Sequence, residues 1–158
     1  MINPRVAING FGRMGRLALR EYLSRPSHSE NYDIVRLNEC AGDAATAAHL
    51  FEFDSIHGVL SGSNRCSVDL AEDDVGHPSI CVDDRVLTYS CTAKLEAADW
   101  SDIDIVIDCT GAYRTSASLA PYFEAGVKKV VVSAPVKDGP LNVVYGVNDH
   151  LYLSLIHI

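Results

Sequence analysis

The sequence predicts an α/β protein with a doubly wound, mostly parallel sheet and a small antiparallel insertion. Three observations support this prediction. Short β-type runs that are apolar almost throughout recur along the chain, as expected for parallel strands buried on both faces. Segments with helical apolar spacing follow several of these runs. Residues 65–91 instead hold short β-type pieces separated by acidic, glycine and proline residues, which is typical of antiparallel strands.

The first part of the chain contains two predicted strand–helix units. The first strand is expected at Val6–Ile8, and the helix after it has one apolar and one arginine-rich face. The apolar face comprises Met14, Leu17, Ala18 and Tyr22. The second strand is expected at Asp33–Glu39, and a helix over Ala44–Glu52 has Asp43 as its N-cap. Phe53–Leu60 is expected to be irregular.

The antiparallel insertion comes next, and the parallel pattern resumes after it. The insertion consists of Cys66–Leu70, Ile80–Val82 and Val86–Tyr89, with a turn at Asp83-Asp84. Further strands are expected at Asp104–Asp108, Lys129–Ser133 and Val143–Val147. A helix is expected at Ser116–Ala125, with Leu119 and Phe123 on its apolar face and Gly126 as its C′ residue.

A glycine motif joins the first strand to the first helix. Gly10-x-Gly12-x-x-Gly15 has the order of parts that a dinucleotide-binding turn requires. Gly10 permits the tight turn, Gly12 lets the backbone approach a pyrophosphate, and Gly15 lets the helix pack closely on the strand. The helix N-terminus offers unpaired N–H groups and a partial positive charge to the phosphates. Such turns also occur without a ligand, and the position between strand and helix favours the dinucleotide.

An acidic residue at the end of the second strand supports the same ligand. Glu39 lies 24 residues after Gly15, and dinucleotide-binding domains place an acidic residue about 20 residues on, against the adenosine ribose. A carboxylate there accepts hydrogen bonds from the ribose hydroxyls and repels a 2′-phosphate, so NAD is favoured over NADP. The alternative is a solvated glutamate at a strand end.

The carboxyl ends of parallel strands lie at one edge of the sheet, where ligands bind. The turns expected at that edge are Asn9-Gly10, Asn38-Glu39, Cys109-Thr110-Gly111 and Ser133-Ala134-Pro135. Each of them could be a simple connection, but their shared location favours contact with one cofactor.

The net charge and the cysteines of the chain indicate which binding partners and which cellular compartment are expected. The chain has 158 residues and a formal net charge of −8. This acidic balance argues against nucleic acid or an anionic membrane as the main partner. The cysteines are Cys40, Cys66, Cys81, Cys91 and Cys109. Their odd number and wide spacing indicate reduced thiols and a cytoplasmic location, and the lack of a CxxC pair argues against structural zinc.

Several motifs together resemble a known family. They are Ile8-Asn9-Gly10-Phe11-Gly12-Arg13-Met14-Gly15-Arg16, Phe53-Asp54-Ser55-Ile56-His57-Gly58, Asp108-Cys109-Thr110-Gly111, Lys128-Lys129-Val130-Val131-Val132-Ser133-Ala134-Pro135 and Tyr145-Gly146-Val147-Asn148. In this order they resemble the NAD-binding half of phosphorylating glyceraldehyde-3-phosphate dehydrogenases, a Rossmann-type domain. The stretch around Glu39 and Tyr113-Arg114-Thr115 is most similar to the arsenic-operon-associated branch, in which arsenate is thought to replace phosphate.

The resemblance implies a set of cofactor-binding residues. They are Gly10, Phe11, Gly12, Arg13, Met14, Gly15, Glu39, Thr110, Gly111 and Ser133. The backbones of Arg13 and Met14 would hold the pyrophosphate of NAD, and Glu39 stands where most members have an aspartate on the ribose. The resemblance also implies a homotetramer that acts on a small-molecule substrate when the protein is full length.

The family's chemistry needs a nucleophilic cysteine and a histidine base, and resemblance places both beyond this sequence. Ser90-Cys91-Thr92 lacks the residues that follow the family's nucleophile, and Cys109 is interpreted as a packing residue. Residues 1–152 are therefore expected to form an NAD-binding domain that is incomplete at its C-terminal end. Residues 153–158 match a translated sequencing adapter and are interpreted as a non-native tail. Without the catalytic domain, the chain is expected to be inactive as a dehydrogenase.

Two other functions remain open from the sequence. One is the corresponding half of an erythrose-4-phosphate dehydrogenase, which the residues of the substrate domain would distinguish. The other is a stand-alone NAD-sensing module without catalysis, which predicts a stable short protein that binds NAD.

Overall fold

The computed structural model describes residues 2–60, 68–72 and 76–152. A seven-stranded sheet runs through this part of the chain, in the order β5-β6-β7-β2-β1-β8-β9. Its strands are β1 (Arg5–Asn9), β2 (Asp33–Asn38), β5 (Val68–Glu72), β6 (Pro78–Val82), β7 (Arg85–Ser90), β8 (Ile105–Asp108) and β9 (Lys129–Val132). The start of the predicted strand at Cys66 and the tail at residues 153–158 lie outside the described residues.

Parallel pairing dominates the centre of this sheet. Strand β1 pairs in parallel with both β2 and β8, β8 with β9, and β2 with β7. The pairs β5–β6 and β6–β7 are antiparallel, and residues 83–84 form the turn of the second pair. The prediction of a parallel sheet with an antiparallel insertion is thus confirmed. The insertion is not a separate unit, because β7 joins it to β2 in the same sheet.

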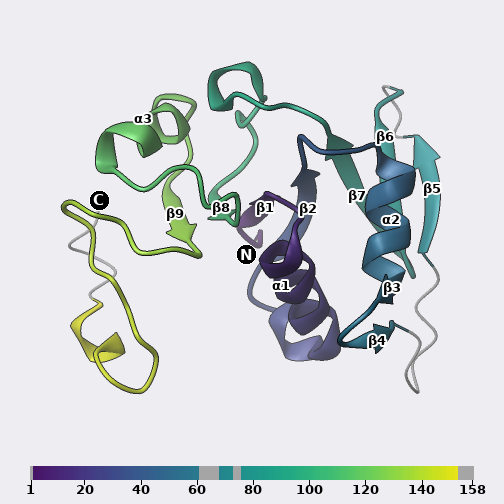
Figure 1. Cartoon of the computed structure of the whole chain (residues 1–158), viewed down its shortest axis with the longest axis horizontal. Coiled ribbons are helices and arrows are strands. Elements are labelled where there is room, and N and C mark those ends of the chain that lie inside the picture. Colours follow the sequence, from purple (N-terminus) through teal and green to yellow (C-terminus); the bar gives the residue numbers. More distant parts are fainter. Residues whose placement is uncertain (1, 61–67, 73–75, 153–158) are drawn as a thin grey trace.

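Helices cover both faces of the sheet (Figure 1). On one face, α1 (Arg13–Ser24) and α2 (Ala44–Glu52) pack on Val6 and Ile8 of β1. On the other face, α3 (Ser116–Glu124) packs in a second core with Ala7 of β1 and Trp100. This alternation along β1 gives the sheet two cores, which is the doubly wound arrangement that the sequence predicts.

In α1 and α3, the residues that face the core differ by a few positions from those predicted. In α1, Met14 is half exposed, and the fully buried residues are Gly15, Leu19 and Tyr22. These lie at i, i+4 and i+7, because the contact of Gly15 with the glycine loop decides which side of the helix meets the sheet. In α3, Phe123 is half exposed and Tyr122 is buried instead, since its phenol reaches the buried carboxylate of Asp108.

Two predictions about local structure are wrong. Phe53–Leu60 contains a small antiparallel pair, β3 (Phe53–Asp54) and β4 (Gly58–Val59), because Asp54 Oδ1 accepts the N–H groups of Ile56 and His57. The connection is also held by Arg20, which donates to carbonyls on both sides of it.

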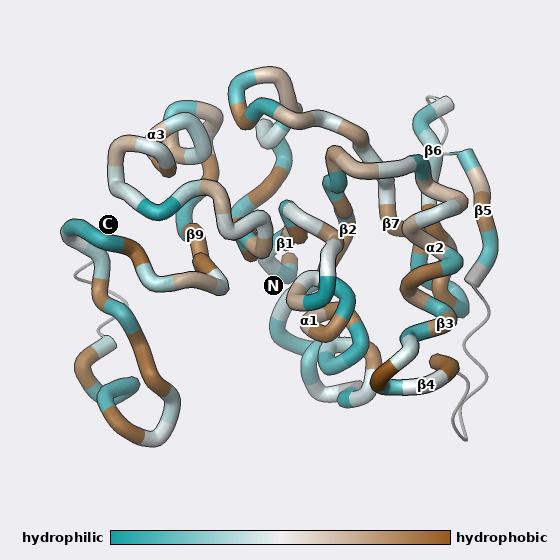
Figure 2. The backbone as a smooth tube through the Cα atoms, in the orientation of Figure 1, coloured by the Kyte–Doolittle hydropathy of each residue, from teal (hydrophilic) through white to brown (hydrophobic). Residues whose placement is uncertain are grey.

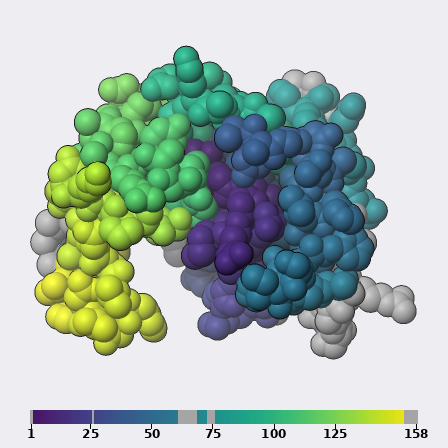
Figure 3. Space-filling model, in the orientation of Figure 1, coloured from purple at the N-terminus to yellow at the C-terminus, as the bar shows by residue number. Residues whose placement is uncertain are grey.

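The other wrong prediction is the strand at Val143–Val147. This segment forms a turn, in which Asn148 Oδ1 accepts the Val144 N–H at 2.6 Å and Asn148 Nδ2 donates to the Asn142 carbonyl at 3.0 Å. These bonds occupy backbone groups that a strand would need for its ladder. Hydrophobic residues are visible along this segment in Figure 2, and Figure 3 shows it projecting beside the body of the protein.

The cap of α2 carries a testable pH dependence. The Thr46 N–H, at 2.8 Å from Asp43 Oδ1, lowers the pKa of that carboxyl below its usual value. The stabilisation by this cap is therefore present above the unfolded-state pKa and is lost as pH falls through the folded-state pKa. We expect Asp43→Ala to lower the midpoint of thermal unfolding at neutral pH, with a smaller difference from the wild type in acid.

Calorimetry at both pH values measures this difference in the midpoint of unfolding, and Asp43→Asn, which keeps a capping oxygen, is the control. An equal difference at both pH values would contradict it.

Candidate cofactor-binding cleft

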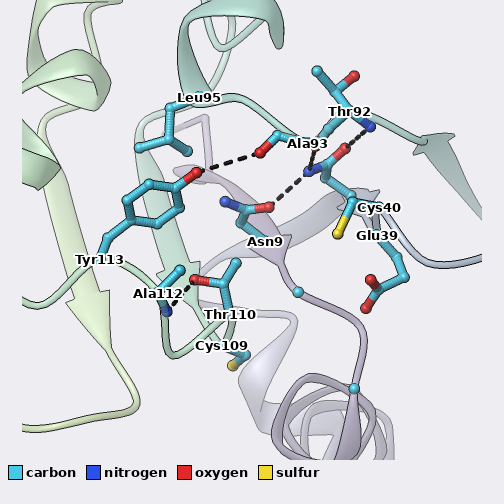
Figure 4. A pocket seen from close by; sticks show the side chains of 13 residues that line it. Asn9, Glu39, Cys40, Thr92, Ala93, Leu95, Cys109, Thr110, Ala112 and Tyr113 are labelled. Carbon is cyan, nitrogen blue, oxygen red and sulfur yellow. Dashed lines mark hydrogen bonds between the residues drawn. The ribbon is translucent and has the colours of Figure 1, made fainter.

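A cleft of about 250 Å³ lies at the carboxyl ends of β1, β2, β7 and β8 (Figure 4). Its lining residues are Asn9, Gly10, Gly12, Asn38, Glu39, Cys40, Thr92, Ala93, Leu95, Cys109, Thr110, Ala112 and Tyr113. Three of the four turns that the sequence places at this edge therefore contribute to one cleft. The fourth turn, which follows β9, does not line it.

The glycine loop forms one end of the cleft. Gly10 has φ of +88°, and a Cβ there would come within 2.7 Å of the backbone of Cys109 and Thr110. Gly12 has no atom within 4 Å of where a Cβ would lie, so the space beside it is open. At Gly15, a Cβ would meet the carbonyl oxygen of Gly10 at 2.2 Å. The loop thus combines a positive φ, an open approach and a close helix contact in the order the motif predicts.

Helix α1 begins directly at this loop. Its N-cap residue, Gly12, makes no side-chain hydrogen bond to the first turn, and that turn contains no acidic residue. The first N–H groups of a helix carry a partial positive charge. Arg13 and Met14, the first two residues of α1, are exposed. This end of the cleft suits an anionic group.

Glu39 directly follows β2 and lies beside the glycine loop. Its Oε2 accepts the Phe11 N–H at 2.8 Å, and its Oε1 accepts the Ala41 N–H at 3.0 Å. A carboxylate oxygen can accept two hydrogen bonds, so each oxygen retains a free lone pair. The carboxylate is therefore held against the glycine loop and can still accept from a ligand hydroxyl.

Tyr89 supports the loop that follows Glu39. Its hydroxyl donates to the Gly42 carbonyl at 3.0 Å. Burial, with smaller contributions from neighbouring anionic groups that include Glu39, raises the pKa of Tyr89 to about 12. The phenol therefore stays protonated at neutral pH and remains a donor to this loop.

Thr110 lies on the β8 side of the cleft with its hydroxyl fixed. Its Oγ1 donates to Asp108 Oδ1 at 2.7 Å and accepts the Ala112 N–H at 3.1 Å. One lone pair remains on the hydroxyl oxygen for a ligand donor. Across the cleft, the Tyr113 hydroxyl donates to the Ala93 carbonyl at 3.4 Å, so the two loops contact each other (Figure 4).

A second cavity, of about 210 Å³, lies on the other side of Glu39. It shares Gly12 and Glu39 with the cleft and is also lined by Phe11, Arg16, Ala41, Thr46, Ala47 and Leu50. The guanidinium of Arg16 donates to the Phe11 carbonyl at 3.1 Å and lies 4.0 Å from Asp54. Most of its other lining residues are apolar.

The structure places the residues expected to bind the cofactor at several positions around the glycine loop and the edge of the sheet. Gly10, Gly12, Glu39 and Thr110 line the cleft, and Phe11 lines the second cavity together with Gly12 and Glu39. Arg13, Met14 and Gly15 form the first turn of α1 beside the loop. Gly111 directly follows Thr110, and Ser133, at the end of β9, is exposed and lines neither cavity.

Sequence reasoning missed one wall of the cleft. Thr92, Ala93 and Leu95 line it because β7 lies beside β2 and brings the chain after Ser90 to the same edge. The apolar alternation of β7 could not reveal its neighbour. Tyr113 closes the same wall, and its place in a branch-specific motif gives no signal of that position.

Two thiols, those of Cys40 and Cys109, line the cleft. Burial raises the pKa of the Cys109 thiol, which lowers its thiolate fraction. His57 contacts Asp54 through both its ring Nδ1 and its backbone N–H. Several hydrogen bonds lower the pKa of the Asp54 carboxyl, and the bond from the His57 backbone N–H contributes most. Within residues 2–60, 68–72 and 76–152, no cluster of metal-ligating side chains is found. No helix in these ranges is long and apolar enough to cross a membrane.

Known proteins that are similar in sequence support a cofactor-binding role for this cleft. A family model described as glyceraldehyde 3-phosphate dehydrogenase, NAD binding domain, matches residues 4–116. Glyceraldehyde-3-phosphate dehydrogenase 3 of Nostoc is 44% identical over 94% of this chain and 41% of its own length. The glyceraldehyde-3-phosphate dehydrogenase of Pseudomonas aeruginosa is 39% identical over 97% of this chain and 43% of its own.

The matches cover nearly all of this chain but less than half of each relative's length. The yeast glyceraldehyde-3-phosphate dehydrogenase 3 is 37% identical over 98% of this chain, which corresponds to 43% of its length. The chain thus spans about two fifths of the relatives it matches. The glycine loop, Glu39 and Thr110 all lie within the part that the NAD-binding domain model covers. The chain therefore belongs to the glyceraldehyde-3-phosphate dehydrogenase family, in its NAD-binding domain.

Proposed function

We propose that the cleft binds NAD with the adenosine ribose at Glu39 and the pyrophosphate over Gly12 and the start of α1. The observation that supports this most strongly is the bond from the Phe11 N–H to Glu39 Oε2 at 2.8 Å. It holds the carboxylate beside the glycine loop, so one ligand can contact both. The free lone pairs of Glu39 suit ribose hydroxyls, and the open space beside Gly12 suits a pyrophosphate.

The other expected residues have supporting roles in this proposal. The backbone N–H groups of Arg13 and Met14 bind the pyrophosphate. Thr110 and Gly111 lie along the cofactor on the β8 side, and Ser133 continues the same edge beyond β9. Bound NAD supplies a hydride acceptor, while the residues described here hold and orient it. Gly10 and Gly15 act by shaping the loop.

For the whole protein, we propose the family reaction. An aldehyde phosphate is oxidised through a cysteine thioester with hydride transfer to NAD, and phosphate then releases an acyl phosphate. Similarity around Glu39 to the arsenic-operon branch extends this proposal to arsenate as the acceptor. The whole protein is proposed to form a homotetramer in the cytoplasm, where its thiols stay reduced. Free Cys40, Cys81, Cys91 and Cys109 are consistent with such a compartment.

Calorimetric titration of the purified chain with NAD tests the binding proposal. We expect saturable, one-to-one binding of NAD and weaker binding of NADP. No binding at millimolar NAD by a chain whose circular dichroism shows it to be folded would reject the proposal.

The same preparation is expected to be inactive as an enzyme. With NAD, glyceraldehyde 3-phosphate and phosphate or arsenate, we expect no formation of NADH. The chain spans about two fifths of its relatives' length, and burial raises the pKa of Cys109, one of the two thiols that line the cleft. NADH absorbance is the measurement. Steady NADH formation by this preparation would contradict the expectation, and Cys109→Ser would then show whether that thiol is required.

A further inference from the structure

The floor of the cleft contains an unusual set of buried polar side chains. Asn9, Asn38 and Asp108 are each at most 3% exposed, and Tyr122 is completely buried. They come from β1, β2, β8 and α3, which are separated in sequence and meet only in the folded sheet. Buried polar groups are costly unless they are hydrogen-bonded. Their partners therefore indicate what they do.

These side chains form one continuous chain of hydrogen bonds. Tyr122 OH donates to Asp108 Oδ2 at 2.6 Å and accepts from Asn9 Nδ2 at 2.5 Å. Asn9 Oδ1 then accepts from Asn38 Nδ2 at 2.7 Å. We call Asp108, Tyr122, Asn9 and Asn38 the floor relay.

Each end of the floor relay holds one wall of the cleft. At the β8 end, Asp108 Oδ1 accepts the Thr110 N–H at 3.0 Å and the Thr110 hydroxyl at 2.7 Å. At the β7 end, Asn38 accepts the Thr92 N–H at 3.0 Å and donates to the Thr92 carbonyl at 2.9 Å. Figure 4 shows the bonds that lead from Asn9 to Thr92. The relay thus connects the two walls beneath the proposed ligand.

The direction of every bond in the floor relay follows from one carboxylate. A carboxylate only accepts, so the single phenolic proton of Tyr122 must point at Asp108. Burial, and then the charge of Asp108, raises the pKa of Tyr122, which keeps that proton in place. The Tyr122 oxygen is left as an acceptor, so Asn9 must present its NH₂ group to it. The Asn9 carbonyl then faces Asn38, whose NH₂ turns toward Asn9.

The orientation of the Asn38 amide determines how it binds Thr92, which forms one wall of the cleft. With its NH₂ turned toward Asn9, Asn38 presents its carbonyl to the Thr92 N–H and to the Ser90 hydroxyl at 2.8 Å. If the Asn38 amide were turned the other way, its NH₂ group would face the Thr92 N–H, and neither group could accept a hydrogen bond. The turned amide would also bring its oxygen against the Thr92 carbonyl, where its NH₂ donates now.

We propose that Asp108 is a positioning residue for the cofactor cleft, which fixes the orientation of the floor relay and through it the wall at Thr92. It contacts Thr110 directly and reaches Thr92 only through Tyr122, Asn9 and Asn38. The proposal rests on NAD as the ligand of this cleft. Its immediate consequence, a change at Thr92 when Asp108 is altered, does not depend on any ligand.

Two substitutions act on the floor relay in different ways. Asp108→Asn keeps the shape of the side chain, but its oxygen is needed by the Thr110 N–H, so it offers an NH₂ group to Tyr122. The phenol then loses the acceptor for its proton, and the orientation of Asn9, which is the partner of Asn38, is no longer fixed from the Asp108 side. Tyr122→Phe removes the connecting hydroxyl and leaves Asp108 in contact with Thr110. Ser79→Ala is the matched control, because its hydroxyl is buried in the same sheet and has no hydrogen-bond partner among the described residues.

Nuclear magnetic resonance of the ¹⁵N-labelled chain without NAD tests the relay itself. We expect the Thr92 backbone amide and the side-chain NH₂ signals of Asn9 and Asn38 to shift in both Asp108→Asn and Tyr122→Phe. In Ser79→Ala they should stay at the wild-type positions. Loss of packing alone would lower stability without moving these signals in the folded protein. Unchanged Thr92 and Asn38 signals in folded Tyr122→Phe would overturn the proposal.

Calorimetric titration with NAD then tests the effect on the cleft. We expect the dissociation constant to rise about tenfold in Asp108→Asn and by a smaller factor in Tyr122→Phe, with no change in Ser79→Ala. Equal affinity in wild type and both relay variants would overturn the positioning role even if the amide signals move. If wild type binds no NAD at all, the proposed function fails, while the amide signals still decide whether the relay exists.

Discussion

The Gly15→Ala variant is expected to lose about 3 kcal/mol or more of folding stability, or to fail to fold. An alanine Cβ at this position would lie 2.2 Å from the carbonyl oxygen of Gly10 and 3.1 Å from Ile8. The first of these atoms belongs to the backbone of the turn and cannot rotate away. Helix propensity alone would favour alanine over glycine by about 1 kcal/mol, so the two effects have opposite signs. Urea denaturation followed by circular dichroism measures the result.

Gly12→Ala is the matched control for that experiment. It has the same chemical change in the same motif, but no atom lies within 4 Å of the added methyl group. We expect this variant to fold with nearly the stability of the wild type and to bind NAD more weakly, because the methyl occupies the proposed path of the pyrophosphate. A Gly15→Ala variant as stable as Gly12→Ala would show that the helix can move away from the loop at little cost.

The Glu39→Ala variant is expected to bind NAD at least tenfold more weakly and to lose its preference over NADP. Hydrogen bonds to a charged group contribute about 1.5–3 kcal/mol each, and ribose offers two hydroxyls. In the wild type, two like charges 4 Å apart repel by about 4 kcal/mol at an effective dielectric constant of 20. That magnitude is enough to exclude a 2′-phosphate from the site. Parallel titrations with NAD and NADP give both affinities.

Glu39→Gln separates charge from shape in this experiment. The amide keeps an oxygen that can accept the Phe11 N–H, which Glu39 Oε2 accepts at 2.8 Å, and it removes the negative charge. We expect it to improve NADP binding relative to NAD while changing the fold little. Equal binding of NAD and NADP by the wild type would reject the assignment of Glu39 to the ribose.

Most of the fold was predictable because its signals are local. The strands β1, β2, β6, β7, β8 and β9, the Asp43 cap and the turn at residues 83–84 depend on neighbours in the sequence, and they appear where expected. Gly126, at the end of α3, has the φ of +100° that a C′ glycine requires. The segment 143–147 differs because its apolar residues predict a strand, whereas the side chain of Asn148 holds its backbone in a turn.

The site was predictable to a smaller extent. The glycine loop and Glu39 follow a spaced motif, so their proximity could be inferred without coordinates. The wall at Thr92 depends on β7 lying beside β2, which strand periodicity does not encode. Tyr122 illustrates the same limit, since helical spacing predicts Phe123 in the core, whereas the buried Asp108 and Asn9 that bind the Tyr122 hydroxyl are distant in sequence.

The first strand lies inside the sheet, between β2 and β8, and this position has a consequence for biosynthesis. One edge of β1 pairs with β2, which is made soon afterwards, but its other edge pairs with β8. The Arg5 N–H that begins this pairing donates to Asp104, 99 positions later. At about 5–20 residues per second, the ribosome needs roughly 5–20 s to deliver that partner. During this interval the nascent chain presents an apolar strand with an unsatisfied edge, so its period of greatest vulnerability to aggregation precedes the synthesis of β8.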